Sequence, residues 1–433
     1  MSRGIAVVTG ATGGIESAIS RRLAGDGYQV AVTVLTGFSG AAASIQAMRL
    51  PAAGLLAIVL LSACSTGPAK PPASARPSAS SSPSASASPT TAALKAPGPF
   101  HYTTATVAQD LVAPWSLDFA KDGAIWFTER PGRVRVIRSG ALVGEPALTL
   151  SVYTASGCEG GLLGLAVKEP YVYVYYTYNG GAANRVSRFS IAGDKLNTEQ
   201  VLLDNIPGGT CYHYGGRIKF GPDGYLYVTT GEGFVAARAA DKNNVSGKIL
   251  RMHDDGSGQE VFAWGFRNPQ GLAFDAAGHL YVSSNGPTGD LGLCCHDEVD
   301  YVQQGAFYGW PAWAGGTRTS FGQGSLPNRS GPLAESGGGT VWAPSGMAFF
   351  AASKGEQPTL FVAELKGTSL RRFVTDAGDP NKVDAQEIVF GGAGRLRDAE
   401  AGPDGCLYVL TNNRDSRGTP GAGDDKILKL CPS

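Results

Sequence analysis

The sequence predicts an all-β protein in which residues 98–433 form a six-bladed β-propeller, preceded by a signal segment and a disordered linker. One strand-like segment recurs six times in this body, and most neighbouring copies are about 50 residues apart, a spacing typical of propeller blades. The composition agrees, because 61 Gly, 16 Tyr and 17 Phe accompany only 17% charged residues. Such a chain suits a turn-rich β fold that is large enough to bury a core.

Residues 1–47 contain, from residue 4, the stretch GIAVVTGATGGIESAISRRL, which indicates a strand, a Gly-rich turn and a helix, followed by a second strand. This opening resembles the start of a short-chain dehydrogenase. Glu16 stands where the third glycine of that fingerprint would allow close packing, and no further βαβ unit follows Thr33. We therefore expect no sheet able to bind a dinucleotide, and we interpret 1–47 as spurious or vestigial, without a part in activity.

Residues 48–64, MRLPAAGLLAIVLLSAC, combine a basic residue, a short apolar run and a small-residue site that ends at Cys64. The segment resembles a bacterial lipoprotein signal with its lipobox. The alternative is an ordinary buried helix, but the apolar run is shorter than the roughly 20 residues that span a bilayer. The resemblance implies export, lipidation of Cys64 and anchoring to the outer face of the cytoplasmic membrane.

Residues 65–97 are rich in Pro, Ser and Ala. A segment of this composition cannot bury enough apolar surface to offset the entropy of folding, so we expect a disordered tether. Six cysteines follow it, and export favours disulfides over a zinc site, for which no ligand spacing is present. The sequence does not decide the connectivity; our guess pairs Cys158 with Cys211, Cys294 with Cys295, and Cys406 with Cys431.

The six copies of the strand signal are short runs of β-branched and aromatic residues, usually behind an Asp-Gly or Ala-Gly turn, as in a strand entered from a tight hairpin. One long interval, 80 residues, contains a Gly/Ser-rich stretch at about 314–339, which we expect to be an insertion between blades. A sandwich or barrel is the alternative fold. The copies are centred on Trp126, Tyr173, Tyr227, Tyr281, Phe361 and Tyr408.

The formal net charge is zero, so nothing favours a nucleic acid as partner, and a small molecule is expected instead. Loops between blades converge on one end of a propeller, and several of these loops carry Arg or Lys in a chain with few charges. Six motifs occur in a fixed order along the chain: EGGLLGLA, H-x-GGRI-x-FGPDG, FRNPQGLAF, FYGWP, APSGMAFF and RLRDAE-x-GPDG. With these motifs the chain resembles the soluble quinoprotein glucose and aldose sugar dehydrogenases, the glucose/sorbosone dehydrogenase family.

This resemblance implies a six-bladed propeller that binds pyrroloquinoline quinone (PQQ) and calcium and oxidises aldose sugars at the anomeric carbon. It implies that His213 is the general base, that Glu232 orients it, and that Arg267 stabilises charge on the quinone. The quinone carries three carboxylates, and buried cations offset the cost of desolvating them. Calcium prefers hard oxygen ligands and polarises a carbonyl that accepts hydride.

The remaining implied roles concern the cofactors and the substrate. Gly286 and Pro287 match the carbonyl pair that binds calcium, Asp297 a supporting carboxylate, and Glu159 a polar contact to the sugar. Tyr212 precedes His213 where some members carry an acid. The residues that match cofactor contacts are Asn268, Gln270, Lys366, Arg395 and Arg397.

Two other classes of function remain open. A catalytically silent cell-surface propeller that binds a glycan or a protein is the main alternative, because fold alone does not decide function. A propeller that only binds a partner has no need of Lys366, Arg395 and Arg397 beside His213. A calcium-dependent lactone hydrolase would need several carboxylates around the metal. The sequence does not identify the preferred sugar or the electron acceptor.

Overall fold

The computed structural model describes residues 3–10, 28–34, 94–289, 292–321 and 329–433. The chain forms two compact units, Met1–Ser86 and Ala87–Ser433. In the first unit, β1 (Arg3–Gly10) and β2 (Tyr28–Val34) pair in parallel. The predicted signal segment, with Cys64, lies outside the described residues. No helix among the described residues is both long enough and apolar enough to cross a membrane.

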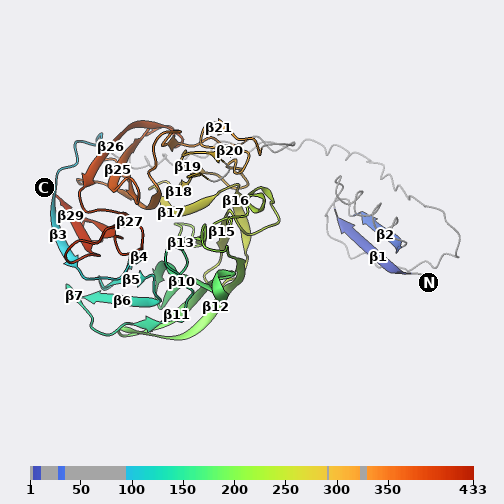
Figure 1. Cartoon of the computed structure of the whole chain (residues 1–433), viewed down its shortest axis with the longest axis horizontal. Coiled ribbons are helices and arrows are strands. Elements are labelled where there is room, and N and C mark those ends of the chain that lie inside the picture. The colour runs from blue at the N-terminus through green and yellow to red at the C-terminus, as the bar shows by residue number, and fades with distance from the viewer. Residues whose placement is uncertain (1–2, 11–27, 35–93, 290–291, 322–328) are drawn as a thin grey trace, which may run out of the picture. The chain divides into compact units, whose positions relative to one another are not determined.

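The second unit is a six-bladed β-propeller, as predicted (Figure 1). Each blade is an antiparallel sheet, and the first strands of neighbouring blades contact one another around a closed ring. The first blade consists of β4 (Pro114–Phe119), β5 (Ile125–Glu129), β6 (Arg133–Arg138) and β7 (Ala141–Leu142), and β8 (Leu148–Thr149) also pairs with β6. The second blade consists of β9 (Leu162–Lys168), β10 (Tyr171–Tyr178), β11 (Ala183–Ala192) and β12 (Lys195–Pro207). The third blade consists of β13 (Gly215–Phe220), β14 (Leu226–Thr230), β15 (Lys248–Met252) and β16 (Glu260–Trp264).

The other three blades continue the same order. The fourth blade consists of β17 (Asn268–Phe274), β18 (Leu280–Asn285), β19 (Glu298–Val302) and β22 (Ala334–Glu335). The fifth blade consists of β23 (Pro344–Phe350), β24 (Thr359–Glu364), β25 (Ser369–Thr375) and β26 (Val383–Gly391). The sixth blade consists of β27 (Leu396–Ala401), β28 (Leu407–Thr411), β29 (Ile427–Pro432) and β3 (Tyr102–Ala108). Three short elements lie between strands: η1 (Asn179–Gly181), α2 (Ala237–Ala240) and the hairpin of β20 (Trp313–Ala314) with β21 (Thr317–Arg318).

The repeated signal in the sequence is the second strand of each blade. All six of its central aromatic residues lie in such strands and are buried. The preceding turns need glycine, because Gly224 and Gly405 have φ of 82° and 76°, a region that L residues with side chains rarely adopt. The signal therefore marks one strand per blade, which is why its spacing predicts the number of blades.

Aromatic contacts between neighbouring blades explain why these positions are aromatic. In four blades the ring of the second strand packs edge-on against a phenylalanine near the end of the next blade's first strand, and such a pair adds about 0.5–1.5 kcal/mol beyond the buried area. The ring centroids are 4.9 Å apart for Tyr173–Phe220, 5.1 Å for Tyr227–Phe274, 5.0 Å for Tyr281–Phe349 and 5.0 Å for Tyr408–Phe119.

The sixth blade closes the ring with strands from both ends of the propeller. Strand β3 pairs with β29 from Tyr102 opposite Pro432 to Ala108 opposite Ile427. The segment before β3 is also bound, since Lys95 N–H donates to Gly355 O at 2.8 Å and Gln357 N–H donates to Lys95 O at 2.9 Å. The body thus makes ordered contacts slightly before the predicted boundary at residue 98.

The predicted position of the insertion at about 314–339 is wrong in one respect. The stretch does not separate two blades, because it contains β22, the fourth strand of the fourth blade, in which Ala334 pairs with Val299 and Glu335 with Glu298. A strand of two residues is too short to show alternation in a sequence. The insertion therefore lies within the fourth blade, between its third and fourth strands.

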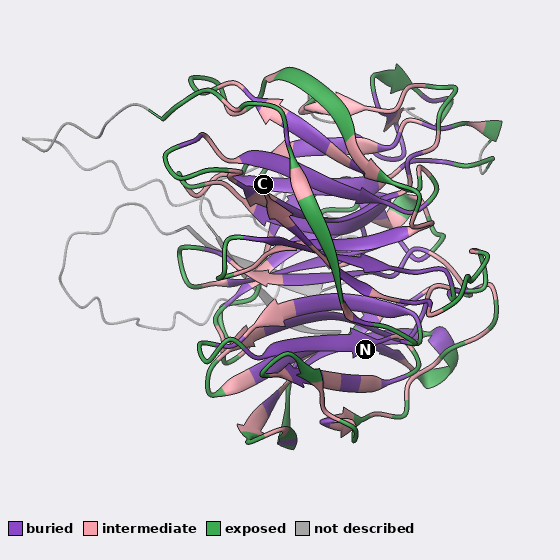
Figure 2. Cartoon of the chain, turned by 90° about the vertical axis from the view of Figure 1, so that its left-hand side faces the viewer, coloured by how far each residue is buried: buried purple, intermediate pink, exposed green. Residues whose placement is uncertain are grey.

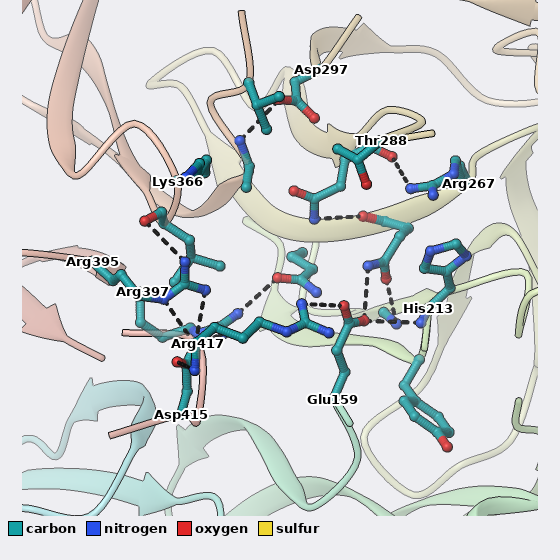
Figure 3. Close-up of a pocket in the computed structure, with 18 of the residues that line it drawn as sticks. Glu159, His213, Arg267, Thr288, Asp297, Lys366, Arg395, Arg397, Asp415 and Arg417 are labelled. Carbon is teal, nitrogen blue, oxygen red and sulfur yellow. Dashed lines mark hydrogen bonds and ion pairs between the residues drawn. The ribbon is translucent and has the colours of Figure 1, made fainter. Parts of the chain in front are cut away.

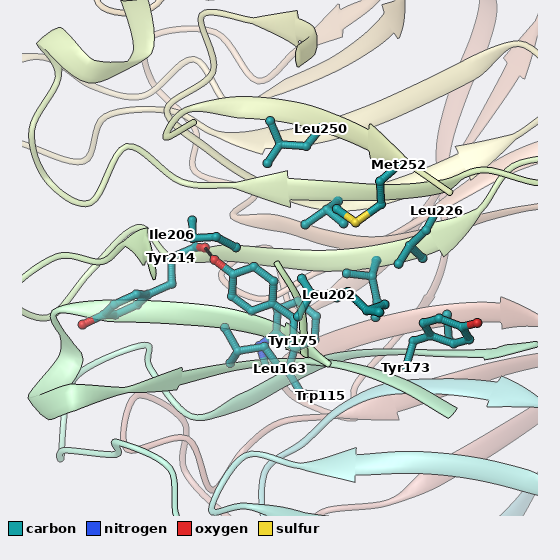
Figure 4. Close-up of a cluster of buried hydrophobic side chains, with 14 residues drawn as sticks. Trp115, Leu163, Tyr173, Tyr175, Leu202, Ile206, Tyr214, Leu226, Leu250 and Met252 are labelled. Atoms are coloured by element: carbon teal, nitrogen blue, oxygen red, sulfur yellow. Dashed lines mark hydrogen bonds between the residues drawn. The ribbon is translucent and has the colours of Figure 1, made fainter. Parts of the chain in front are cut away.

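The core lies between the blades, where the strands are buried and the surface loops are exposed (Figure 2). The cluster between the second and third blades includes Trp115, Tyr173 and Tyr175 (Figure 4). The Tyr175 hydroxyl donates to the carbonyl of Tyr214 at 3.0 Å. This buried bond fixes the backbone next to His213, so the core also positions a predicted site residue.

Candidate active site

A cavity lies at one end of the propeller (Figure 3). First and second strands are antiparallel, so the start of each first strand and the end of each second strand reach the same end of a blade. The loops there surround about 440 Å³, within the range of roughly 300–1,000 Å³ typical of small-molecule sites. Ten of the predicted residues line it: Glu159, His213, Arg267, Asn268, Gln270, Gly286, Asp297, Lys366, Arg395 and Arg397.

Two predicted residues lie beside this cavity rather than on its wall. Glu232 is buried and contacts His213, and Pro287 lines a small neighbouring hollow together with Gly286 and Arg267. The lining residues that were missed include Trp115, Arg130, Asn285, Asp415 and Arg417. Arg130 and Asp415 follow the second strands of their blades, the place where Glu232 and Lys366 also lie, so the repeat itself could have indicated them.

His213 and Glu232 form a buried pair. His213 Nδ1 lies 2.5 Å from Glu232 Oε1, and the two residues are only 5% and 2% exposed. His213 has a φ of 61°, and Gly231 passes so close that a Cβ there would lie 2.0 Å from the His213 carbonyl oxygen. Because Nδ1 is engaged by Glu232, Nε2 is the ring nitrogen available to a ligand.

Glu159 links three parts of the wall. Its carboxylate accepts the His213 backbone N–H at 2.9 Å and the Asn268 side-chain amide at 3.2 Å, and it forms an ion pair with Arg417 at 3.1 Å. Burial alone would raise the pKa of Glu159, but His213 and Arg417 outweigh burial and the pKa is lowered. Glu159 is therefore an acceptor for hydrogen bonds at the cavity wall.

The cationic side of the cavity is built from β27 and the loops near it. Arg397 Nη1 donates to Gln270 Oε1 at 2.8 Å, while Arg395 donates through Nε and Nη2 to Asp415 Oδ2 at 3.0 and 2.9 Å. Burial lowers the pKa of Arg397 despite the nearby Asp415, and its Nε has no hydrogen-bond partner. A buried, incompletely paired guanidinium indicates a site for an anion.

Another part of the cavity wall is a loop held by Asp297. Asp297 Oδ1 accepts the Gly286 N–H at 2.8 Å, and Oδ2 accepts the N–H groups of Trp342 and Ala343 at 2.7 and 2.9 Å. Arg267 Nη1 donates to the Gly286 carbonyl at 2.7 Å. Burial raises the pKa of Asp297, although these N–H donors oppose the shift. Asp297 therefore supports the loop and has both oxygens engaged.

The three disulfides join the predicted cysteines, Cys158–Cys211, Cys294–Cys295 and Cys406–Cys431. The first lies at the site, because Cys158 precedes Glu159 and Cys211 is two residues before His213. The Glu159 N–H also donates to the Cys211 carbonyl at 2.9 Å. This disulfide therefore ties together the two loops that carry Glu159 and His213.

Replacing Cys158 and Cys211 together with serine should lower the free energy of unfolding by about 2–4 kcal/mol and also lower turnover, because the two loops lose their covalent link. Serine at Cys406 and Cys431 is the matched control, since that pair lies between strands of the sixth blade, away from the cavity wall. Thermal unfolding and turnover of the folded fraction measure the two effects. Equal turnover in the two double variants would contradict a positioning role.

Comparisons with known proteins agree with the geometry. Residues 111–419 match the family model described as Glucose / Sorbosone dehydrogenase. A Thermus thermophilus oxidoreductase named as a glucose dehydrogenase has 40% identity and a TM-score of 0.68, with 76% of this chain and 100% of that chain covered. The PQQ-bound aldose sugar dehydrogenase of Streptomyces coelicolor has 31% identity and a TM-score of 0.63, with 77% and 98% covered.

A curated relative gives the same result. The aldose sugar dehydrogenase YliI of Escherichia coli is 29% identical, with 75% of this chain and 92% of the relative covered. The matched region contains every strand from β4 to β28 and all the residues that line the cavity, while β3 and β29 of the sixth blade lie outside it. The predicted resemblance is confirmed: this chain belongs to the glucose/sorbosone dehydrogenase family.

Proposed function

We propose that this propeller is a PQQ- and calcium-dependent dehydrogenase that oxidises aldose sugars at the anomeric carbon to the lactone. The observation that carries the proposal is the cavity itself, in which a buried His213–Glu232 pair faces a set of cations. Those cations are Arg130, Arg267, Lys366, Arg395, Arg397 and Arg417. The carboxylates on the same wall are fewer, Glu159, Asp297 and Asp415, so a polyanionic ligand would balance the charge.

The residues present fit the quinone. Its carboxylates need buried donors, and Arg397 offers an unpartnered Nε on the cavity wall, beside Lys366 and Arg395. Asp415 orients the Arg395 guanidinium through two hydrogen bonds. Trp115 contacts one of these cations, with the Arg397 Cζ atom 5.5 Å from its ring centroid. We propose that these side chains hold the carboxylates of the cofactor.

The fit for calcium rests on neutral oxygens. No group of three or more His, Cys, Asp or Glu side chains able to hold a metal occurs among the described residues, whereas Gly286 and Asn285 line the cavity and Asn285 Oδ1 has no partner. Calcium accepts carbonyl and amide oxygens. We propose that the carbonyls of Gly286 and Pro287 bind it, with Asp297 holding the loop.

The chemistry supplied by the bound quinone is acceptance of a hydride. His213 Nε2 removes the proton of the anomeric hydroxyl, and Glu232 holds Nδ1–H and stabilises the imidazolium that forms. Arg267, which donates to the Gly286 carbonyl, would stabilise negative charge on an oxygen of the bound cofactor. Glu159 accepts a hydrogen bond from another hydroxyl of the sugar.

The proposal is tested by treating the purified protein with a chelator and then adding quinone and calcium. A panel of aldoses is assayed with an artificial electron acceptor. We expect oxidation only when both are present. Saturable sugar binding with no oxidation under any loading would instead assign the chain to the silent binding propellers.

We further propose that the protein is exported and anchored through lipid on Cys64, as the signal-like segment 48–64 indicates. The Cys64→Ala variant should leave the propeller folded but move it from the membrane fraction to the soluble fraction, because the segment that follows supplies no other anchor. Ser82→Ala in the linker is the control and should remain with the membranes. Sedimentation of Cys64→Ala with membranes after a high-salt wash would contradict the proposal.

A further inference from the structure

A buried ion pair joins two blades close to the cavity without lining it. Arg217 in β13 of the third blade lies 2.8 Å from Asp398 in β27 of the sixth blade, measured from Nη1 to Oδ2. The two side chains are only 5% and 3% exposed, and neither residue is part of the cavity wall. Arg217 belongs to the GGRI motif and Asp398 to RLRDAE, and the proposed function gives neither residue a role.

This pair links strands from four blades. Arg217 Nε donates to the Gln270 carbonyl in the fourth blade at 2.9 Å, and Nη1 also donates to Ser116 Oγ in the first blade at 2.8 Å. Asp398 Oδ2 accepts the Leu117 N–H, again from the first blade, at 3.1 Å. A planar guanidinium can make these contacts together, whereas the ammonium of a lysine has no such fork.

Two partners of Arg397 at the cavity wall rest on this pair. The Trp115 ring centroid lies 4.3 Å from Arg217 Cζ and 5.5 Å from Arg397 Cζ. Gln270 is bonded through its carbonyl to Arg217 and through Oε1 to Arg397 Nη1, at 2.9 and 2.8 Å. Trp115, Gln270 and Arg397 all line the cavity. The buried pair therefore contacts both groups against which the Arg397 guanidinium lies.

We propose that Arg217 and Asp398 are positioning residues for Arg397. They fix the Trp115 ring and the Gln270 backbone, and these two groups direct the guanidinium of Arg397 into the cavity. The inference rests on the proposed function, in which Arg397 holds a carboxylate of the quinone. Because the pair is neutral as a whole, its removal alters the geometry of the site and leaves the net charge unchanged.

The test removes both charges at once in the variant Arg217→Met/Asp398→Asn. A single change would bury an unpaired charge, whereas neutralising both partners avoids that cost, and asparagine still offers an oxygen to the Leu117 N–H. We expect Kd for quinone, measured by equilibrium titration, to rise about 10-fold, about 1.4 kcal/mol, and excess quinone to restore part of the turnover. Arg217→Lys keeps the ion pair without the fork and should also raise Kd, so it replaces the double variant if that one does not fold.

The matched control is a second ion pair on the same two strands. Lys219 Nζ lies 2.6 Å from Glu400 Oε2, two residues further along both β13 and β27, and neither residue lines the cavity. Lys219→Met/Glu400→Gln should leave Kd for quinone unchanged. An equal rise in both double variants would show that such pairs only hold the third and sixth blades together. That result would overturn the inference, as would an unchanged Kd in Arg217→Met/Asp398→Asn.

Crystal structures of the wild type and of Arg217→Met/Asp398→Asn without quinone give a readout that does not depend on the proposed function. Loss of the 2.8 Å contact between Arg397 Nη1 and Gln270 Oε1 in the variant supports positioning even if the wild type binds no quinone, in which case the proposed function alone fails. Retention of this contact overturns the inference whatever the affinity for quinone.

Discussion

Replacement of His213 by alanine is expected to lower turnover by about 10²–10⁴-fold, the usual contribution of a positioned general base. The change should leave the affinity for quinone and calcium nearly intact, because the groups proposed to hold them lie on other blades. Steady-state turnover at saturating sugar, measured during a titration with quinone, separates the two effects.

Glu232→Gln is the matched variant for this prediction. Glu232→Gln should lower turnover less than His213→Ala does, since the imidazole ring remains in place and loses mainly the carboxylate that stabilises its charged form. The buried 2.5 Å contact between His213 Nδ1 and Glu232 Oε1 shows that the Glu232 side chain orients the imidazole of His213. Recovery of full turnover in His213→Ala on addition of quinone would show that His213 binds or packs and is not the base.

Arg397→Ala is expected to weaken quinone binding by about 2–5 kcal/mol, or roughly 30-fold to several thousand-fold in Kd, because it leaves a buried cofactor carboxylate without its partner. Excess quinone should restore part of the rate, since His213 and Glu232 are unchanged. Equilibrium titration with quinone measures the affinity directly.

Lys366→Ala should also weaken quinone binding, but less than Arg397→Ala does, because an ammonium makes no bidentate contact with a carboxylate. The control is Arg251→Ala, which removes the same charge from an outer ion pair with Glu260 and should change neither affinity nor rate. A loss of turnover in Arg397→Ala that saturating quinone leaves untouched would contradict cofactor binding and would indicate a role in the chemical step.

The sequence predicted the propeller because each blade repeats one strand with a buried aromatic residue at its centre, which in four blades packs against a phenylalanine of the next blade. Trp126, Tyr173 and Phe361 are far apart in the chain, yet each occupies the same place in its blade. The fourth strand of the fourth blade could not be predicted, since Ala334 and Glu335 pair through the backbone over two residues. Pairing of that kind is set by the neighbouring strand and leaves no pattern in the side chains.

The site was predictable where a motif names the residue, as for His213 and Arg397. Arg417 carried no such signal, because it lies in a turn-rich loop and is held at the cavity by partners from another blade, an ion pair with Glu159 and a hydrogen bond to the Gly157 carbonyl. Contacts between blades depend on ring closure, which no local pattern reports.

Closure of the sixth blade also orders events during synthesis. Strand β3 is among the first segments of the propeller to leave the ribosome, and its partner β29 is the last strand to appear. The entropic cost of joining such distant segments must be met before their hydrogen bonds stabilise the product. Until β29 arrives, the exposed strands at both ends of the unfinished ring are open to pairing with other chains. A nascent propeller of this design is therefore most vulnerable to aggregation just before its final strand is made.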